Sequence, residues 1–244
     1  MECIHASWER KNLGVDSYEI LLSPTDTVPA IIEEEKRVVA QGARYIVLKT
    51  PVNCPHLLFT LPTLGYTFVE MVFHVCIKRN QYHIREDVAR FDRGLTVHAI
   101  TEEADSARIS QRIAQGIFVS DRVSVDPAFS LALSSQRYIN WIHTMRQGGA
   151  TLYEVRLKEK PIGFFVIERK SPTTVDPVLM GLYDAQNDRG LGALLHKKTL
   201  DTCFTYDCTQ LTSTVVSNNA KVLRIYVHAG ATLSDTLYTY VKHI

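Results

Sequence analysis

The segment from Val178 to Leu200 combines an apolar strand, a turn with two glycines and the start of a helix. Gly190 and Gly192 lie in this turn. A helix N-terminus presents unpaired backbone N–H groups and the positive end of the helix dipole, and glycines let the backbone approach a ligand closely. The pattern therefore indicates an anion site suited to a pyrophosphate. Taken alone, it fits a structural turn better, because it lacks the third glycine of a dinucleotide-binding fingerprint and the Gly-Lys-Ser/Thr of a Walker motif.

A second group of spaced residues follows the next expected strand. Asn219 precedes a helix that carries Tyr226 seven residues later, and Gly230 follows four residues after that. A tyrosine has an ordinary pKa of about 10, so it is protonated at neutral pH and can act as a general acid. The alternative is a tyrosine that only packs on its helix, with the hydroxyl at the surface.

Together the two groups resemble the motifs of the GNAT superfamily of acyl-CoA-dependent N-acyltransferases. The family's loop pattern, Arg/Gln-x-x-Gly-x-Gly/Ala, is similar to residues 187–192 (NDRGLG), with Asn187 where the family usually has Arg or Gln. The spacing of Asn, Tyr and Gly described above is similar to the family's later pattern. The order of expected strands and helices over residues 95–244 is also that of a GNAT domain.

The resemblance implies a fold and a reaction. Strands 178–184 and 211–216 would splay apart to admit acetyl-CoA as co-substrate, and a primary amine would attack its thioester directly. Tyr226 would be the general acid that protonates the departing thiolate. The residues expected to bind acetyl-CoA are Leu182, Tyr183, Asp184, Asn187, Arg189, Gly190, Leu191, Gly192, Ala193 and Asn219. For the general base, the sequence leaves Asp184, Glu154, Glu168 and a relayed water open.

Three further segments resemble the two-domain TDP-fucosamine (dTDP-4-amino-6-deoxygalactose) acetyltransferases, in which an N-terminal α/β domain precedes the GNAT domain. They are residues 8–14, 65–79 and 118–142. This narrower resemblance implies a small-molecule amine acceptor, an amino sugar linked to a nucleotide. Arg122 would pair with a nucleotide phosphate, and Tyr138 would line the sugar or base surface.

Two other readings stay open for the acceptor side. The chain could acetylate a different amine, such as a polyamine, an amino acid or a protein N-terminus, or it could be a non-catalytic module that binds acyl-CoA. Tyr138 and Trp141 lie three residues apart on an expected helix, so they fit core packing equally well.

Composition excludes several classes of protein. Of the 244 residues 45% are hydrophobic and 22% are charged, with a net charge of +1, so nothing indicates a disordered chain or a nucleic-acid partner. We expect no membrane span, because no apolar run approaches about 18 residues, and no signal peptide at the N-terminus. Five scattered cysteines favour free thiols and a cytoplasmic location, and Cys203 with Cys208 offer too few ligands for a metal.

Alternating strands and helices predict an α/β protein with mixed sheets. We expect a smaller N-terminal α/β domain at residues 1–85, a linker at 86–94 and the GNAT domain at 95–244. The expected strands are 17–23, 44–51, 66–79, 95–100, 178–184, 211–216 and 232–244, with a hairpin at 151–171. The expected helices are 27–42, 54–65, 101–118, 129–149, one from the glycine turn to about 207, and 218–230.

Some single positions carry expectations of their own. Alternation in strand 66–79 directs Phe68, Met71 or Phe73, Val75 and Ile77 to buried faces. Thr101 is expected to cap the following helix. The final strand, 232–244, is expected near a sheet edge, and its apolar side chains would favour pairing with another chain, as in a homodimer.

Overall fold

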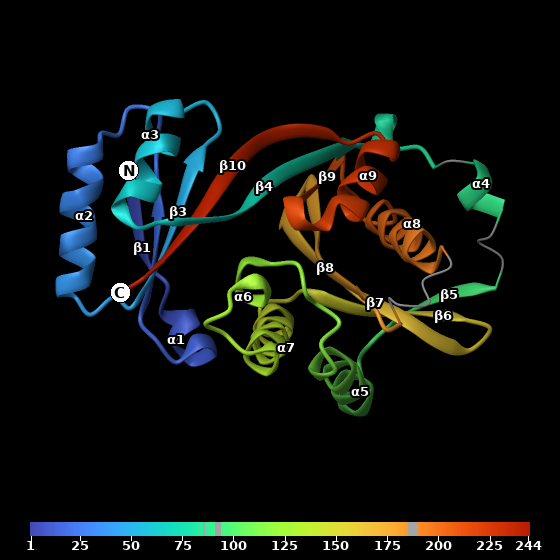
Figure 1. Ribbon diagram of the computed structural model, residues 1–244. Coiled ribbons are helices and arrows are strands. Elements are labelled where there is room, and N and C mark those ends of the chain that lie inside the picture. Colours follow the sequence, from blue (N-terminus) through green and yellow to red (C-terminus); the bar gives the residue numbers. More distant parts are fainter. Residues whose placement is uncertain (85, 91–93, 185–189) are drawn as a thin grey trace.

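Ten strands form one mixed sheet within the residues that the computed structural model describes, which are 1–84, 86–90, 94–184 and 190–244. In chain order the strands are β1 (Glu2–His5), β2 (Ser17–Leu21), β3 (Tyr45–Pro51), β4 (Thr67–Lys78), β5 (Leu95–Ala99), β6 (Thr151–Leu157), β7 (Lys160–Ser171), β8 (Thr174–Leu182), β9 (Gln210–Val216) and β10 (Thr232–His243). Their order in the sheet is β1-β2-β3-β10-β4-β9-β8-β7-β6-β5 (Figure 1). The predicted α/β class with a mixed sheet is confirmed.

Helices lie on both faces of this sheet. They are α1 (Ser7–Leu13), α2 (Val28–Ala40), α3 (Pro55–Thr60), α4 (Glu86–Ala89), α5 (Glu103–Ala114), α6 (Arg122–Val125), α7 (Leu131–Gln147), α8 (Leu191–Cys203) and α9 (Ala220–His228). Each predicted strand and helix has a counterpart here, and β1, α1, α4 and α6 were not predicted. Short 3₁₀ turns at Leu61–Leu64, Arg79–Gln81 and Ser217–Asn219 complete the described elements.

The central strands are apolar on both faces because helices cover both. In β7, Phe164 and Val166 pack on the side of α5 and α7, whereas Phe165 and Ile167 pack on the side of α8 and α9 (Figure 1). Burial of each such side chain contributes about 1.5–3 kcal/mol. The consecutive run of hydrophobic residues therefore fixes this strand in the middle of the layers.

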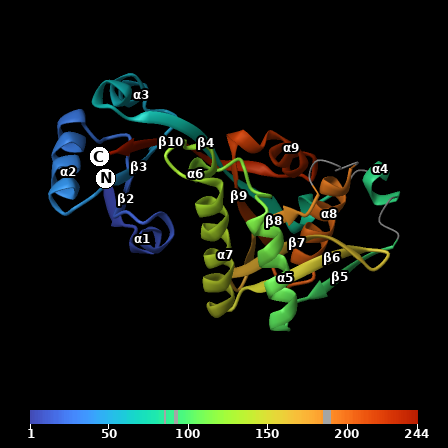
Figure 2. The same ribbon diagram turned by 60° about the horizontal axis from the view of Figure 1, so that its bottom comes forward.

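The N-terminal half repeats the same two-sided arrangement. Ile46 and Leu48 of β3 pack in a cluster with side chains of α2 and α3. Val47, on the opposite face, packs with Leu13 of α1 and Val123 of α6. Helix α6 thus rests on the N-terminal strands although it lies between α5 and α7 in the chain, and Figure 2 shows it at the top of α7.

The final strand lies inside the sheet, so its predicted place near an edge is wrong. β10 pairs antiparallel with β3 on one side, where Tyr240 faces Leu48, and with β4 on the other, where Leu237 faces Val72. Its backbone N–H and C=O groups are therefore used on both sides. Between Leu237 and Val241, β10 therefore has no free edge for pairing with another chain.

Two other local predictions are also wrong. Phe68 is 48% exposed, whereas Glu70 and Val72 of the same strand are buried. The register between β4 and β10 shifts between these residues, because Thr239 faces Glu70 whereas the next residue, Tyr240, faces Phe68. Helix α5 begins at Glu103 with Glu102 as its N-cap residue, so Thr101 does not cap it.

The sheet runs without a break across the predicted domain boundary at residue 85. β4 pairs with β9, and β9 pairs with β8, so strands from both sides of the boundary lie side by side. Both ends of the chain lie in the N-terminal half (Figure 1). In the described parts of the chain, no helix is both long and apolar enough to cross a membrane.

Candidate functional site

The neighbouring parallel strands β8 and β9 separate soon after they meet. They pair only at Thr174 with Gln210 and at Val175 with Leu211. Beyond these pairs, each strand continues with its other neighbour alone. The predicted splay of these two strands is therefore present. One cavity beside it is lined by residues 177–180 and 213–216, and another is lined by residues 180–182 at the end of β8.

One of these spaces, here called the glycine cavity, lies where β8 ends and α8 and α9 begin. Its volume is about 590 Å³. It is lined by residues 117–120, 180–182, Gly190, Gly192, Ala193, Leu195, His196, Asn218, Asn219, Lys221, Val222, Arg224, Ile225 and His228. The described lining residues include Lys221, Arg224 and two histidines and no Asp or Glu, so the cavity favours an anion.

Gly190 precedes the first residue of α8 with φ of +86°, in the left-handed region that favours glycine. The first turn of a helix has backbone N–H groups without intrahelical acceptors. Gly181, on the adjacent strand, is held by packing instead, because a Cβ there would lie 2.7 Å from Phe164 and 2.8 Å from Ile117. The glycines therefore serve both the turn and the close packing behind it.

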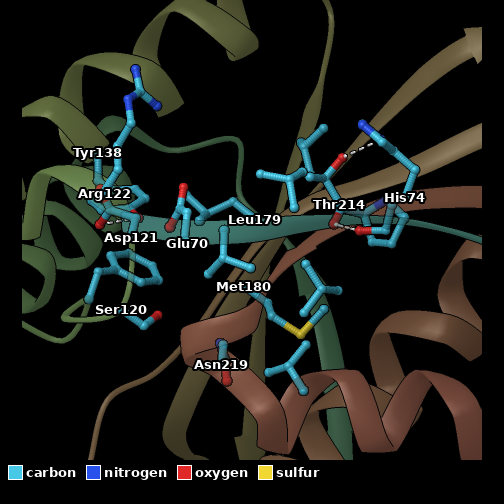
Figure 3. A pocket seen from close by; sticks show the side chains of 18 of the residues that line it. Glu70, His74, Ser120, Asp121, Arg122, Tyr138, Leu179, Met180, Thr214 and Asn219 are labelled. Atoms are coloured by element: carbon cyan, nitrogen blue, oxygen red, sulfur yellow. Dashed lines mark hydrogen bonds between the residues drawn. The ribbon is translucent and has the colours of Figure 1, made fainter. Parts of the chain in front are cut away.

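The other space, here called the carboxylate cavity, lies toward the N-terminal half and has a volume of about 410 Å³. It shares Phe118, Ser120, Met180, Asn219 and Val222 with the glycine cavity, so the two meet across the gap. Figure 3 shows Glu70, Asp121, Arg122 and Tyr138 on one side of it and His74 with Thr214 on the other. Its lining residues come from strands β3, β4, β8, β9 and β10, from helices α7 and α9, and from the segment that leads into α6.

A network of ion pairs stands beside the carboxylate cavity. One terminal nitrogen of Arg122 lies 3.0 Å from Glu9 and 3.2 Å from Glu19. Arg137 lies 2.9 Å from Glu9, and Lys49 lies 2.9 Å from Glu19. Burial opposes the charge on Glu19, but Arg122 and Lys49 hold its pKa below the usual range. These cations are therefore engaged with carboxylates of the same chain.

Asp121 organises the entrance to α6. Its carboxylate accepts a hydrogen bond of 3.0 Å from the Val123 backbone N–H and one of 2.7 Å from the Tyr138 hydroxyl. A hydroxyl hydrogen bond from Ser124 adds to these. Burial acts against the ionised form, yet these hydrogen bonds keep the pKa of Asp121 below its usual range. Tyr138 in turn stacks on Phe118 with ring centres 4.2 Å apart, which gives the cavity one aromatic wall.

Glu70 is the carboxylate of this cavity without a partner. It is 4% exposed, and its buried Oε2 has no hydrogen-bond partner in the described structure. Burial raises its pKa to about 7, against the influence of Arg122. Sequence reasoning missed Glu70; a charged residue within an otherwise apolar strand was the available signal.

Tyr226 reaches the carboxylate cavity from α9 and is 1% exposed. Within the described residues its hydroxyl oxygen has no hydrogen-bond partner of normal geometry. Burial raises the pKa of Tyr226, and the neighbouring Ser213 hydroxyl opposes this only in part. The phenol is therefore protonated at neutral pH, as a proton donor must be, and it lies in the interior rather than at the surface.

The predicted site residues divide between the two cavities. Leu182, Gly190, Gly192, Ala193 and Asn219 line the glycine cavity. Arg122, Tyr138, Tyr226 and again Asn219 line the carboxylate cavity. Asn187 and Arg189 lie outside the described residues.

Three predicted cofactor-binding residues line neither cavity: Tyr183, Asp184 and Leu191. The Tyr183 side chain points elsewhere, because its hydroxyl donates a 3.0 Å hydrogen bond to Glu154. Of the candidate bases, Glu154 pairs with Arg108 at 2.8 Å and Glu168 pairs with Lys170 at 2.7 Å. Neither of these carboxylates lines the two cavities, so neither is placed to take a proton there.

No group of histidine, cysteine or acidic residues in the described ranges could hold a metal ion. Cys203 and Cys208 are buried free thiols, and the Cys208 thiol lies 3.5 Å from the Cys203 carbonyl oxygen. Both belong to the apolar cluster beneath α8.

No protein-family model matches this sequence, and no curated protein matches it. Solved structures do resemble it. A GCN5-related N-acetyltransferase from Sphaerobacter thermophilus is 11% identical with a TM-score of 0.62, over 99% of this chain and 75% of that one. One from Kribbella flavida is 14% identical with a TM-score of 0.59, over 93% and 81%.

A third similar structure contains the GCN5-related glucosamine N-acetyltransferase region of a fungal multi-domain β-N-acetylglucosaminidase. It is 10% identical with a TM-score of 0.63, and the match covers 98% of this chain and 30% of that one. Identities this low compare backbones rather than site residues. Together the likenesses show that this chain has the fold of the GCN5-related N-acetyltransferases.

Proposed function

We propose that this protein is an N-acetyltransferase that moves an acetyl group from acetyl-CoA to the primary amine of a small molecule. The observation that carries the proposal is the gap between β8 and β9, with an anion-favouring cavity at one mouth and a cavity containing Tyr226 at the other. A thioester arm through such a gap would present its carbonyl to an acceptor on the far side. The fold of the similar acetyltransferases supports the same reading.

The glycine cavity suits the phosphates of CoA. The N-terminus of α8, which follows Gly190, supplies backbone N–H groups and the positive helix dipole, and Lys221 and Arg224 add charge. Asn219 lines both cavities and would contact the pantetheine arm of acetyl-CoA.

Tyr226 is our candidate for the general acid. The amine nitrogen attacks the thioester carbonyl carbon, the C–S bond breaks, and the departing thiolate takes the phenolic proton. Three features support this role: the hydroxyl is buried, no group in the described structure bonds it with normal geometry, and burial keeps it protonated by raising its pKa. Such a proton transfer contributes about 10²–10⁴ in rate.

An amino sugar is the acceptor class that we favour. The narrower sequence resemblance points to one, and a structurally similar region acts on glucosamine. The aromatic wall of Tyr138 and Phe118 suits the apolar face of a sugar ring. The nucleotide-linked form depended on a phosphate contact from Arg122, and that guanidinium already pairs with Glu9 and Glu19.

The experiment is an acceptor panel with acetyl-CoA, read as release of free CoA thiol. The panel contains D-glucosamine, a TDP-linked amino sugar, spermidine, an amino acid and a peptide with a free N-terminus. We expect turnover with the amino sugars. Calorimetric binding of acetyl-CoA without turnover of any amine would instead support a non-catalytic acyl-CoA-binding module.

A further inference from the structure

The carboxylates in and beside the carboxylate cavity outnumber the lysines and arginines there in the described structure. Several titratable side chains line this cavity with Glu70 or form ion pairs with residues that line it. They are Glu9 on α1, Glu19 on β2, Lys49 on β3, His74 on β4, Asp121 and Arg122 at the start of α6, and Arg137 on α7. The three cations, Lys49, Arg122 and Arg137, each lie within ion-pair distance of Glu9, Glu19 or Asp121. Glu70 is the carboxylate left over.

Sheet register places a second unpartnered group beside it. Thr239 of β10 is opposite Glu70 on β4 and opposite Lys49 on β3. Directly opposed residues of antiparallel strands share a face, and Val47 and Val241, two residues along, pack against Val123 of α6 on that face. The buried Oγ1 of Thr239 has no hydrogen-bond partner in the described structure.

An unpaired buried carboxylate is costly, so its presence calls for an explanation. Glu70 is almost fully buried and lines the cavity, and Figure 3 shows it between the Asp121–Arg122 segment and the strand that carries Leu179. A cationic group delivered into the cavity would supply the missing partner. A phosphate would not, because the cations there are already paired.

We propose that Glu70 receives the ammonium group of the acceptor and accepts one of its protons, with the buried Thr239 hydroxyl opposite it available to hydrogen-bond to the carboxylate. This inference rests on the proposed function and names the base and the charge class of its acceptor. The ammonium gives one proton to Glu70, and the neutral nitrogen attacks the acetyl carbon. The nitrogen loses its second proton to solvent as the amide forms, and the C–S bond breaks. The thiolate takes the phenolic proton of Tyr226 and leaves as free CoA thiol. Tyr226 then regains a proton from solvent, and Glu70 releases its proton to solvent.

The position of Glu70 suits this exchange at neutral pH. Because burial raises its pKa to about 7, the carboxylate can both take a proton from the ammonium and return it to water. An acceptor with an ammonium and no phosphate fits best, so D-glucosamine is expected to be acetylated at least tenfold more efficiently than D-glucosamine 6-phosphate. Equal efficiencies would overturn this charge argument.

The test compares Glu70→Gln with Asp176→Asn. Asp176 is the matched control, because it also has an unpartnered buried oxygen and a pKa raised by burial to about 7, yet it does not line the carboxylate cavity. The pH dependence of kcat/KM is measured with the best cationic amine of the panel. It is measured again with acetohydrazide, whose nucleophilic nitrogen is uncharged at neutral pH and needs no deprotonation before it attacks.

We expect Glu70→Gln to lower kcat/KM at least 100-fold for the cationic amine and no more than about fivefold for acetohydrazide. The residual activity of Glu70→Gln should use only the free amine, so its pH dependence should follow the ionisation of the amine and no longer that of Glu70. Asp176→Asn should keep the wild-type pH profile, and acetyl-CoA affinity should be unchanged in both variants. Equal losses on both acceptors, or a wild-type pH profile in Glu70→Gln, would overturn the inference alone. If the wild-type protein acetylates no amine, the proposed function fails and the inference fails with it.

Discussion

The glycine cavity and the carboxylate cavity differ in how the chain builds them and in the charge they present. The described residues of the glycine cavity come mainly from one stretch of chain, from Met180 to His228, and include cations but no carboxylate. The carboxylate cavity gathers β3, β4, α7, β9 and β10, and it retains an unpaired carboxylate. A gap between β8 and β9 joins the two.

This contrast separates two kinds of recognition. An invariant anionic group can be bound by backbone N–H groups at a helix start, which a short motif encodes. An acceptor is recognised by side chains that only the completed sheet brings together. The first kind leaves a signature in the sequence, and the second kind does not.

The largest effect is expected at Tyr226, which lines the carboxylate cavity. Tyr226→Phe should lower kcat about 10³-fold, because the thiolate loses its proton donor, with acetyl-CoA affinity unchanged. Tyr66→Phe is the matched control, since Tyr66 is also buried with an unpartnered hydroxyl but packs in the cluster with α2 and α3. Steady-state kinetics and calorimetry give the two readouts. Undiminished turnover in Tyr226→Phe would remove Tyr226 as the acid.

The carboxylate cavity should also leave a trace in stability. Burial raises the pKa of Glu70 from 4.5 to about 7, so the folded state binds the proton more tightly than the unfolded state does. The cost of ionising Glu70 is therefore absent at low pH, grows as pH rises through this range, and is complete above pH 7. Glu70→Gln should gain about 2 kcal/mol in unfolding free energy, relative to wild type, between pH 5 and pH 8.

Urea unfolding of both proteins at the two pH values measures this difference. Glu33→Gln serves as the control, because the Glu33 side chain is 73% exposed and should show no such trend. A stability difference between Glu70→Gln and wild type that does not change with pH would show that Glu70 is not a buried, ionisable carboxylate.

A smaller effect is expected at the glycine turn. Gly190→Val should weaken acetyl-CoA binding about tenfold, because φ of +86° strains a β-branched residue and the start of α8 would shift. Gly149→Val imposes the same kind of strain, with φ of +94° and open space around it, at the end of α7 away from both cavities. Only the first variant should change the calorimetric Kd. Equal affinities in both would argue against a phosphate site at the turn.

The smallest effect concerns the exposed cations of the glycine cavity. Lys221→Gln combined with Arg224→Gln should raise the Kd of acetyl-CoA about fivefold at low salt, and salt should reduce the difference by screening. Lys36→Gln, on the distant α2, should leave the Kd unchanged. If the double variant has no effect at any ionic strength, the positive charge of this cavity plays no part in binding.

Local patterns in the sequence were enough to predict much of the fold. Apolar runs and end signals predict β3, β7 and α7, because these features can be read within each segment. They do not predict that β10 inserts between β3 and β4, because that pairing joins segments far apart in the chain. The error about an exposed edge followed from treating β10 as the end of a domain.

The site residues divide in the same way, between those that a local motif predicts and those that only packing reveals. Gly190, Asn219 and Tyr226 were predicted from a motif, and the structure brings them to the two cavities beside the gap. Glu70 was missed because its significance depends on the absence of a partner, which only packing reveals. Arg122 was expected to bind a phosphate, but Glu9 and Glu19, both distant in sequence, already engage its guanidinium.

The most direct measurement is a crystal structure of the protein with bound CoA. We expect the diphosphate at the start of α8, the pantetheine arm between β8 and β9, and the thiol on the side of Tyr226 and Glu70. CoA bound away from this gap, or a gap closed by side chains with no room for the arm, would contradict the account.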